Sequence, residues 1–247
     1  INLIYIFKEK NEGVNNAVND GFKKIKSYFF YVCATDDIID KDFAMKSLNL
    51  LSKYPSSPFV FSNICINNEI NKKKIKLNFN FLNQGYYDSI SVFKIFKNNQ
   101  FKIYHNTVMF RSKNFLEDNI HSNKYGDRCD MLNLYYLSFK HGFVYLDEFL
   151  SEFTIRKGQI GIMKNDQYLY DELIFLKKTK YDFYKKYIAA KLHYDFSILI
   201  LPTFIKNKNY SEISLNWVFR SLKFRIWKFI RFLLPDKFLD FLFNLFK

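Results

Sequence analysis

Two adjacent carboxylates, Asp36 and Asp37, come just after the apolar run Tyr28–Ala34. A run this dense in aromatic residues predicts a buried strand, and ligand crevices in open α/β sheets form beyond the carboxyl ends of parallel strands. Neighbouring carboxylates repel each other unless a cation lies between them. A divalent ion, Mn²⁺ or Mg²⁺, shared with substrate phosphates fits this chemistry. The alternative is that Thr35 or Asp36 caps the next helix and that Asp37 favours its N-terminal dipole.

Strands and helices alternate around this acidic pair. Apolar runs predict strands at Ile1–Phe7, Tyr28–Ala34 and Phe59–Ile66, and helical spacing predicts helices at Gly13–Lys26 and Asp42–Leu51. Strand, helix and strand at this spacing predict right-handed crossovers. The fold class is therefore expected to be α/β, with a mainly parallel sheet flanked by helices.

The second half of the chain is less regular. Its Asn- and Lys-rich segment Asn67–Asn99 predicts loops and short pieces. Strands are expected at Lys102–Phe110, Phe143–Leu146 and Phe153–Ile155, and helices at Asp130–His141, Tyr168–His193 and Ser211–Leu234.

Composition narrows the class of protein. The 247 residues are 49% hydrophobic and 20% aromatic, which excludes intrinsic disorder. Three widely spaced cysteines and four histidines without metal-ligand spacing offer neither a disulfide framework nor a zinc site. The net charge of +14 requires an anionic partner, which could be a nucleic acid, a membrane or a phosphorylated substrate.

The segment Glu9–Phe43 resembles family 2 glycosyltransferases of the GT-A fold. The matching residues are Gly13, Ala17, Asn19, Gly21, Asp36 and Asp37. One departure is Ala34, which stands where the family pattern has its first acidic or amide residue. The resemblance implies that Asp36 and Asp37 hold a metal that bridges the sugar-nucleotide diphosphate. It also implies that Gly13 and Asn19 lie against the donor.

Two further segments support the resemblance. His105 and Asn106 resemble the His-Gln segment of a subgroup of these transferases, which places His105 in the acceptor region. The segment Cys129–Gly161 resembles the Glu-Asp helix, strand and loop that follow. The resemblance implies that Asp130 deprotonates the acceptor hydroxyl, with Asp127 as the alternate. A plain helix N-cap is the other interpretation of Asp130.

Arg156 and Lys157 follow the last of these strands, where the family loop folds over the diphosphate. Their positive charges would neutralise the leaving phosphate. The loop departs from the family pattern, since Gln159 and Gly161 replace small hydroxyl residues. The alternative is a solvated basic turn.

The carboxyl-terminal segment carries a different signal. Ser211–Leu234 has apolar residues at helical spacing, basic residues over much of the remaining surface, and Trp217 and Trp227 near the boundaries. A second short apolar helix is expected at Lys237–Phe246. Basic amphipathic helices of this kind lie in membrane interfaces. The alternative is that the apolar face packs on the catalytic domain.

Together these features predict three parts: a GT-A (Rossmann-like) domain over residues 1–165, a helical extension over 166–210, and membrane-associating amphipathic helices over 211–247. Because the chain opens at Ile1 inside an apolar run, the first strands of the family domain are expected to be missing.

The resemblance implies an inverting, metal-dependent glycosyltransferase in surface polysaccharide synthesis. Its partners would be a nucleotide-sugar donor, with a UDP-sugar as first choice, a saccharide or lipid-linked acceptor, and an anionic membrane surface. No nucleic acid partner is expected, and the location would be peripheral to the cytoplasmic face of the cell membrane. Two alternatives stay open: a non-catalytic basic module that binds membranes or nucleic acid, and an inactive remnant without its donor pocket.

Overall fold

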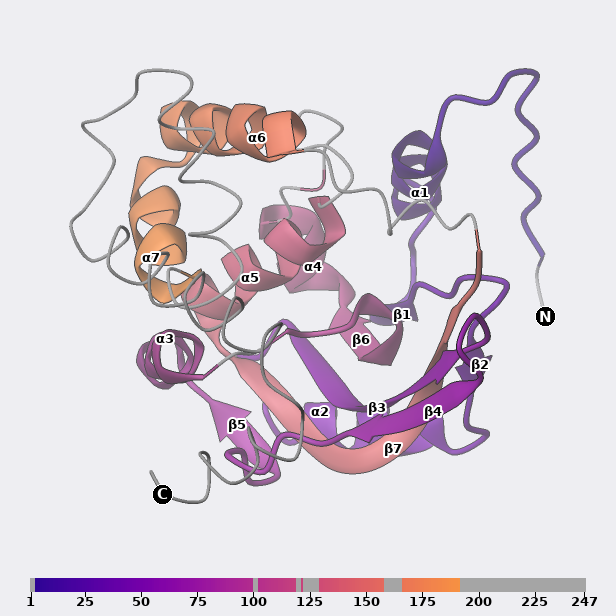
Figure 1. The fold of residues 1–247 in the computed structure, drawn as a ribbon, viewed down its shortest axis with the longest axis horizontal. Coiled ribbons are helices and arrows are strands. Elements are labelled where there is room, and N and C mark those ends of the chain that lie inside the picture. The colour runs from indigo at the N-terminus through magenta and orange to yellow at the C-terminus, as the bar shows by residue number, and fades with distance from the viewer. Residues whose placement is uncertain (1–2, 100–101, 119–120, 122–128, 158–165, 192–247) are drawn as a thin grey trace, which may run out of the picture.

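The computed structural model describes residues 3–99, 102–118, 121, 129–157 and 166–191 (Figure 1). Within these residues one sheet of seven strands forms. Its strands are β1 (Phe29–Tyr31), β2 (Ile38–Ile39), β3 (Phe59–Asn68), β4 (Lys73–Leu77), β5 (Gly85–Tyr87), β6 (Val108–Arg111) and β7 (Phe143–Ile155). The helices are α1 (Val14–Phe22), α2 (Phe43–Ser52), α3 (Ser89–Asn98), the 3-10 turn η1 (His105–Thr107), α4 (Ser112–Asp118), α5 (Cys129–His141), α6 (Asp166–Thr179) and α7 (Tyr181–Lys191).

The α/β class is confirmed, but the sheet is mixed and not mainly parallel. Its central order is β1-β6-β3-β7-β2, with β4 beside β3 and β5 beside β7. Among the described strands only β3 and β7 pair in parallel. The reason is that β6 enters antiparallel between β1 and β3 and separates two strands of the same direction. β1 and β3 therefore run in the same direction, as the predicted crossover between them requires, but they are not neighbours in the sheet.

The predicted first strand is wrong over its described residues. Residues 3–7 have no regular secondary structure, and Leu3 is 88% exposed and Phe7 72% exposed. Apolar residues form a strand only where a ladder partner and a face to bury against are available. No described strand pairs with this segment. The next residue, Lys8, forms an ion pair of 2.6 Å from its Nζ to Asp20 Oδ2 of α1.

The strand predictions after residue 100 also need correction. The strand expected at Lys102–Phe110 starts only at Val108, because Thr107 folds back on Tyr104. The backbone N–H of Thr107 donates to the Tyr104 carbonyl over 2.9 Å, and its hydroxyl donates to the same oxygen over 2.7 Å. The two strands expected within 143–155 are one long strand, β7, whose register against β3 shifts on both sides of Asn63.

Two helix predictions also need correction. The segment Asn67–Asn99, expected to form loops and short pieces, contains the ten-residue helix α3, whose N-cap Asp88 accepts a hydrogen bond of 2.7 Å from the Ser91 backbone N–H. The single helix expected at Tyr168–His193 divides, within the described residues, into α6 and α7 on either side of Lys180. The predicted helices at Gly13–Lys26, Asp42–Leu51 and Asp130–His141 are present as α1, α2 and α5.

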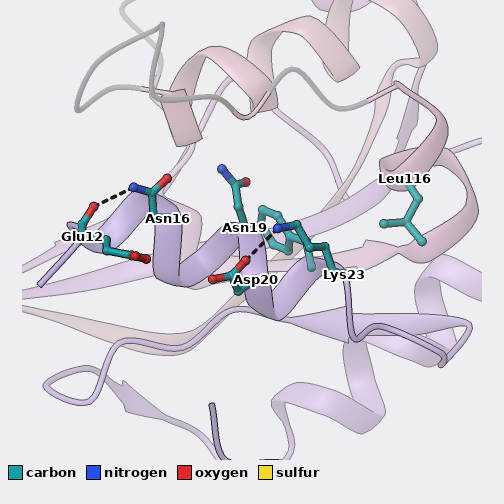
Figure 2. A pocket seen from close by; sticks show the side chains of 7 residues that line it. Glu12, Asn16, Asn19, Asp20, Lys23 and Leu116 are labelled. Atoms are coloured by element: carbon teal, nitrogen blue, oxygen red, sulfur yellow. Dashed lines mark hydrogen bonds and ion pairs between the residues drawn. The ribbon is translucent and has the colours of Figure 1, made fainter. Parts of the chain in front are cut away.

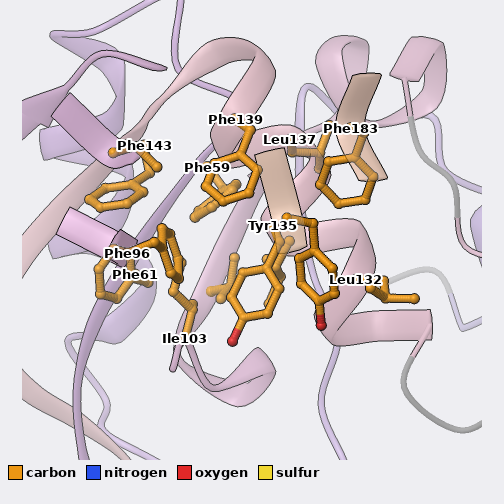
Figure 3. Close-up of a cluster of buried hydrophobic side chains, with 14 of the residues drawn as sticks. Phe59, Phe61, Phe96, Ile103, Leu132, Tyr135, Leu137, Phe139, Phe143 and Phe183 are labelled. Carbon is orange, nitrogen blue, oxygen red and sulfur yellow. The ribbon is translucent and has the colours of Figure 1, made fainter. Parts of the chain in front are cut away.

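Strand alternation builds a hydrophobic layer on each face of the sheet. One layer packs sheet residues against α3, α5 and α7, among them Phe59, Phe61, Phe110, Phe143 and Tyr145 (Figure 3). The other layer packs the alternate sheet residues Val60, Met109, Val144 and Leu146 against Phe43, Leu50 and Leu51 of α2. Because both faces are covered, the sheet forms a rigid base for the loops at its ends.

No helix among the described residues is long and apolar enough to cross a membrane. The two amphipathic helices predicted within 211–247 lie outside the described residues, as does Asp127.

Candidate active site

The Asp36–Asp37 turn connects β1 to β2. The backbone N–H of Asp37 donates to the Ala34 carbonyl over 3.3 Å, and the next residue, Ile38, pairs with Glu152 of β7. The next helix, α2, begins at Phe43 with Asp42 at its N-cap, so the helix-cap interpretation of Thr35 or Asp36 is wrong. The pair is instead held at the sheet edge by the β2–β7 ladder.

The carboxylate of Asp37 is placed where a cation would fit. Its Oδ1 atom is buried without a hydrogen-bond partner, and the same holds for the amide Nδ2 of Asn106. Burial, and then the charge of Asp36, raise the pKa of Asp37, while Thr154 and the Asn106 amide act in the opposite direction. A divalent cation would offset both the burial and the repulsion.

The donor set fits a metal ion that is shared with a ligand. No group of three His, Cys, Asp or Glu side chains that could hold a metal occurs in the described part of the chain. Mn²⁺ or Mg²⁺ bound by Asp36 and Asp37 would therefore need further oxygens from phosphate and water, which is how Mg²⁺ is usually held in nucleotide sites.

The turn η1 brings Asn106 close to Asp37. The Tyr31 hydroxyl donates a hydrogen bond of 2.8 Å to the Asn106 backbone carbonyl, and burial raises the pKa of Tyr31. Burial lowers the pKa of His105, whereas the charge of Asp130 acts to raise it. Asn106 therefore lies beside Asp37, while the neighbouring His105 responds to the charge of Asp130.

Asp130 lies in the first turn of α5, one residue inside the helix start. Its Oδ1 accepts a hydrogen bond of 2.6 Å from the Met131 backbone N–H. A carboxylate in this position can accept a proton from a hydroxyl group in the site. Asp36 and Asp37 thus lie by the Asn106 end of η1, and Asp130 is near enough to His105 to influence its pKa.

Asn19, a predicted donor residue on α1, lines an open hollow of about 610 Å³ (Figure 2). It is lined by Glu12, Asn16, Asn19, Asp20, Phe22, Lys23 and Leu116. Gly13, at the start of α1, has a φ of +83°, which favours glycine. Asn19 Oδ1 lies 2.8 Å from His121 Nδ1, so this side chain is directed towards His121.

The predicted phosphate-binding cations Arg156 and Lys157 follow the carboxyl end of β7. Arg156 Nε donates to Glu69 Oε2 over 3.1 Å, and each of these side chains is 49% exposed. Lys157 is exposed in the turn that follows. Arg156 lies two residues beyond Thr154, which contacts Asp37, but its guanidinium group is paired with Glu69. A diphosphate role for either cation stays a prediction.

Three residues at the site were missed by the sequence reasoning. Asn106 was used only as part of the His105 motif, and Tyr31 carried no signal beyond that of an apolar strand. His121 was considered only in excluding zinc, because its partners Asn19 and Cys129 are distant or unremarkable in sequence. Their proximity depends on the fold and not on spacing.

Comparison with known proteins finds a family that matches the first part of the chain. The family described as "Glycosyl transferase family 2" matches residues 1–115. No curated protein matches the chain. Among solved structures, the crystal structure of S. aureus TarS 1-349 is similar with a TM-score of 0.50 and 13% identity, over 89% of this chain and 73% of that one. At that identity the likeness concerns the fold alone. Residues 1–115 therefore carry a glycosyl transferase family 2 domain, as the motifs from Gly13 to Asp37 predicted.

Proposed function

We propose that this chain is an inverting, metal-dependent glycosyltransferase that moves a sugar from a nucleotide-sugar donor to a saccharide or lipid-linked acceptor. The observation that carries the proposal is the buried, unpartnered Oδ1 of Asp37 beside Asp36 in a family 2 domain. An oxygen in that state is suited to a cation that arrives with its ligand. A UDP-sugar is the first choice of donor.

Asp36 and Asp37 would hold Mn²⁺ or Mg²⁺. When bound, the ion offsets the charge that develops on the departing nucleoside diphosphate. Asn106 offers a buried amide N–H donor close to Asp37. A donor of this kind can orient a phosphate or sugar oxygen, since leaving it unsatisfied when buried costs about 1–3 kcal/mol.

Asp130 would act as the base. Its carboxylate takes the proton from the acceptor hydroxyl as that oxygen bonds to the anomeric carbon. The bond from the anomeric carbon to the diphosphate oxygen breaks in the same step, and its electron pair leaves with the diphosphate. One displacement of this kind inverts the anomeric configuration. His105, whose pKa the charge of Asp130 acts to raise, would line the acceptor-binding side of the site.

The wider setting of the reaction rests on the sequence. The basic amphipathic segment 211–247 would dock on the anionic cytoplasmic face of the cell membrane. The reaction would form glycosidic bonds of a surface polysaccharide.

The experiment is nucleotide release from UDP-, GDP- and CMP-sugars in the presence of Mn²⁺. The wild-type chain should release nucleotide from one donor class, and Asp36→Asn should lose this activity. Asp130→Asn should still bind that nucleotide but turn over about 10²–10⁴-fold more slowly. Glu117→Gln, which removes an exposed carboxylate on α4, is the matched control. Release that is indifferent to Asp36 and Asp130 would contradict the proposal.

A further inference from the structure

A path of hydrogen bonds that the proposed reaction does not use joins α1 to α5 through His121. Nδ1 of His121 lies 2.8 Å from Asn19 Oδ1, and its Nε2 lies 3.1 Å from Cys129 Sγ. The Phe22 ring packs edge-on against the imidazole, with 5.2 Å between ring centroids. Cys129 is fully buried and is the first residue of α5. The path therefore ends one residue before Asp130.

The chemistry of the two partners fixes the tautomer of His121. An amide oxygen can only accept, so Nδ1 must carry the hydrogen that is donated to Asn19. Nε2 is then unprotonated and accepts the weak hydrogen bond of the Cys129 thiol. The bond at Nε2 requires a neutral ring, because a protonated Nε2 can only donate. Burial, and then the charge of His105, lower the pKa of His121 to about 4, so the ring is neutral in the ordinary working range.

We propose that His121 is a positioning residue, which fixes the first turn of α5 against α1 and so sets the place of the Asp130 carboxylate. This inference rests on the proposed role of Asp130. A carboxylate in the first turn moves with the start of its helix, and here that start is held by the Cys129 thiol. Asn19 then serves the helix of the base, a role different from the donor contact that the family resemblance implies.

The kinetic test uses hydrolysis of UDP-glucose, UDP-N-acetylglucosamine and GDP-mannose with Mn²⁺, in which water takes the place of the acceptor. His121→Leu should lower kcat about 10–100-fold with little change in the KM for the donor, because a small displacement of the base slows chemistry more than binding. His121→Gln, whose amide can donate to Asn19 and accept from Cys129, should recover much of the loss. In an Asp130→Asn background His121→Leu should have no further effect.

A second pair of variants tests the same role of His121 by changing its other partner, Cys129. Cys129→Ser keeps a donor for Nε2, whereas Cys129→Ala removes it, so only the alanine variant should lower kcat. This pair also serves if His121→Leu fails to fold. An equal loss in the Asp130→Asn background, or a rise in KM at unchanged kcat, would overturn the proposal.

A measurement without ligand separates this inference from the proposed function. In ¹⁵N-histidine spectra of the full chain, His121 should carry its hydrogen on Nδ1 at neutral pH. The side-chain carboxyl signal of Asp130 should shift in His121→Leu and stay in place in His121→Gln. The opposite tautomer, or an Asp130 signal indifferent to both changes, overturns the positioning role even if turnover is normal. A wild-type chain that hydrolyses none of the three donors contradicts the proposed function, and the spectra then decide the positioning role alone.

Discussion

The hydroxyl of Tyr31, at the end of β1, donates a hydrogen bond of 2.8 Å to the backbone carbonyl of Asn106 in η1. This bond joins two segments that are 75 residues apart in sequence. It holds the Asn106 amide beside Asp37, and it keeps His105 close enough to Asp130 for the charge of Asp130 to act on the pKa of His105. The catalytic arrangement that we propose therefore depends in part on a phenol to which the mechanism gives no chemical role.

Removing this hydroxyl should weaken both the fold and the site. Tyr31→Phe is expected to lower the free energy of unfolding by about 1 kcal/mol, the usual contribution of one such hydrogen bond. It should also weaken Mn²⁺-dependent nucleotide binding, because η1 loses its anchor. Tyr28→Phe, which removes a hydroxyl from a side chain that is 87% exposed, is the control. Chemical denaturation and nucleotide titration measure the two effects, and equal behaviour of both variants would contradict the anchor.

Asp37 should reduce stability in the absence of a metal ion. Its pKa is raised in the folded chain, so at acid pH both states are protonated and Asp37→Asn should match the wild type. As pH rises, the unfolded chain releases its proton first and the wild type loses stability relative to the variant. We expect Asp37→Asn to have the higher Tm at neutral pH in EDTA, although it binds no metal. A Tm gap that does not change with pH would rule out this burial effect.

Gly142 joins α5 to β7 in a conformation that other residues rarely adopt. Its φ is +80°, and an added Cβ would overlap the backbone oxygen of Tyr87 and lie 3.0 Å from Asp88 Cα. Gly142→Ala should therefore lower the free energy of unfolding by at least about 2 kcal/mol. Gly21→Ala, where nothing lies within 4 Å of the added carbon, should be neutral or stabilising. Chemical denaturation of both variants measures the two changes in unfolding free energy. A smaller loss of stability in Gly142→Ala than in Gly21→Ala would refute the prediction.

Arg111 ties the end of α2 to the sheet. Its guanidinium donates to the carbonyls of Leu51 and Ser57 over 2.8 and 3.1 Å, and it lies 5.0 Å from the Phe29 ring centroid. A lysine ammonium is a single point of charge and cannot reproduce this fork. Arg111→Lys should therefore lose about 1–3 kcal/mol of unfolding free energy. Lys113→Arg, an exposed substitution in α4, should be neutral. No loss in Arg111→Lys would show that its carbonyl contacts are dispensable.

Local patterns predicted the elements around Asp36 and Asp37 but not their pairing. The spacing of apolar residues in α1, α2 and α5 is a local property, and these helices were predicted. The insertion of β6 between β1 and β3 depends on where η1 turns, which the Thr107 side chain helps to set. Hydrophobicity alone also misplaced residues 3–7, since a strand needs a partner as well as apolar side chains.

The candidate site divides in the same way. Asp36, Asp37 and Asp130 were found because they belong to motifs with fixed spacing. Tyr31 and His121 were not found, because each acts through a partner that only the fold brings near. The pairing of Arg156 with Glu69 could not be predicted either, because it joins the ends of two parallel strands, β3 and β7.

The most direct measurement is a thermal-shift panel of UDP, GDP and CMP, each with and without Mn²⁺, on the wild-type chain and on Asp36→Asn. We expect one nucleotide to raise the Tm only when Mn²⁺ is present, and Asp36→Asn to lose this rise. A rise that needs no metal or survives in Asp36→Asn, or no rise with any nucleotide, would contradict the assignment of the Asp36–Asp37 turn as the donor site.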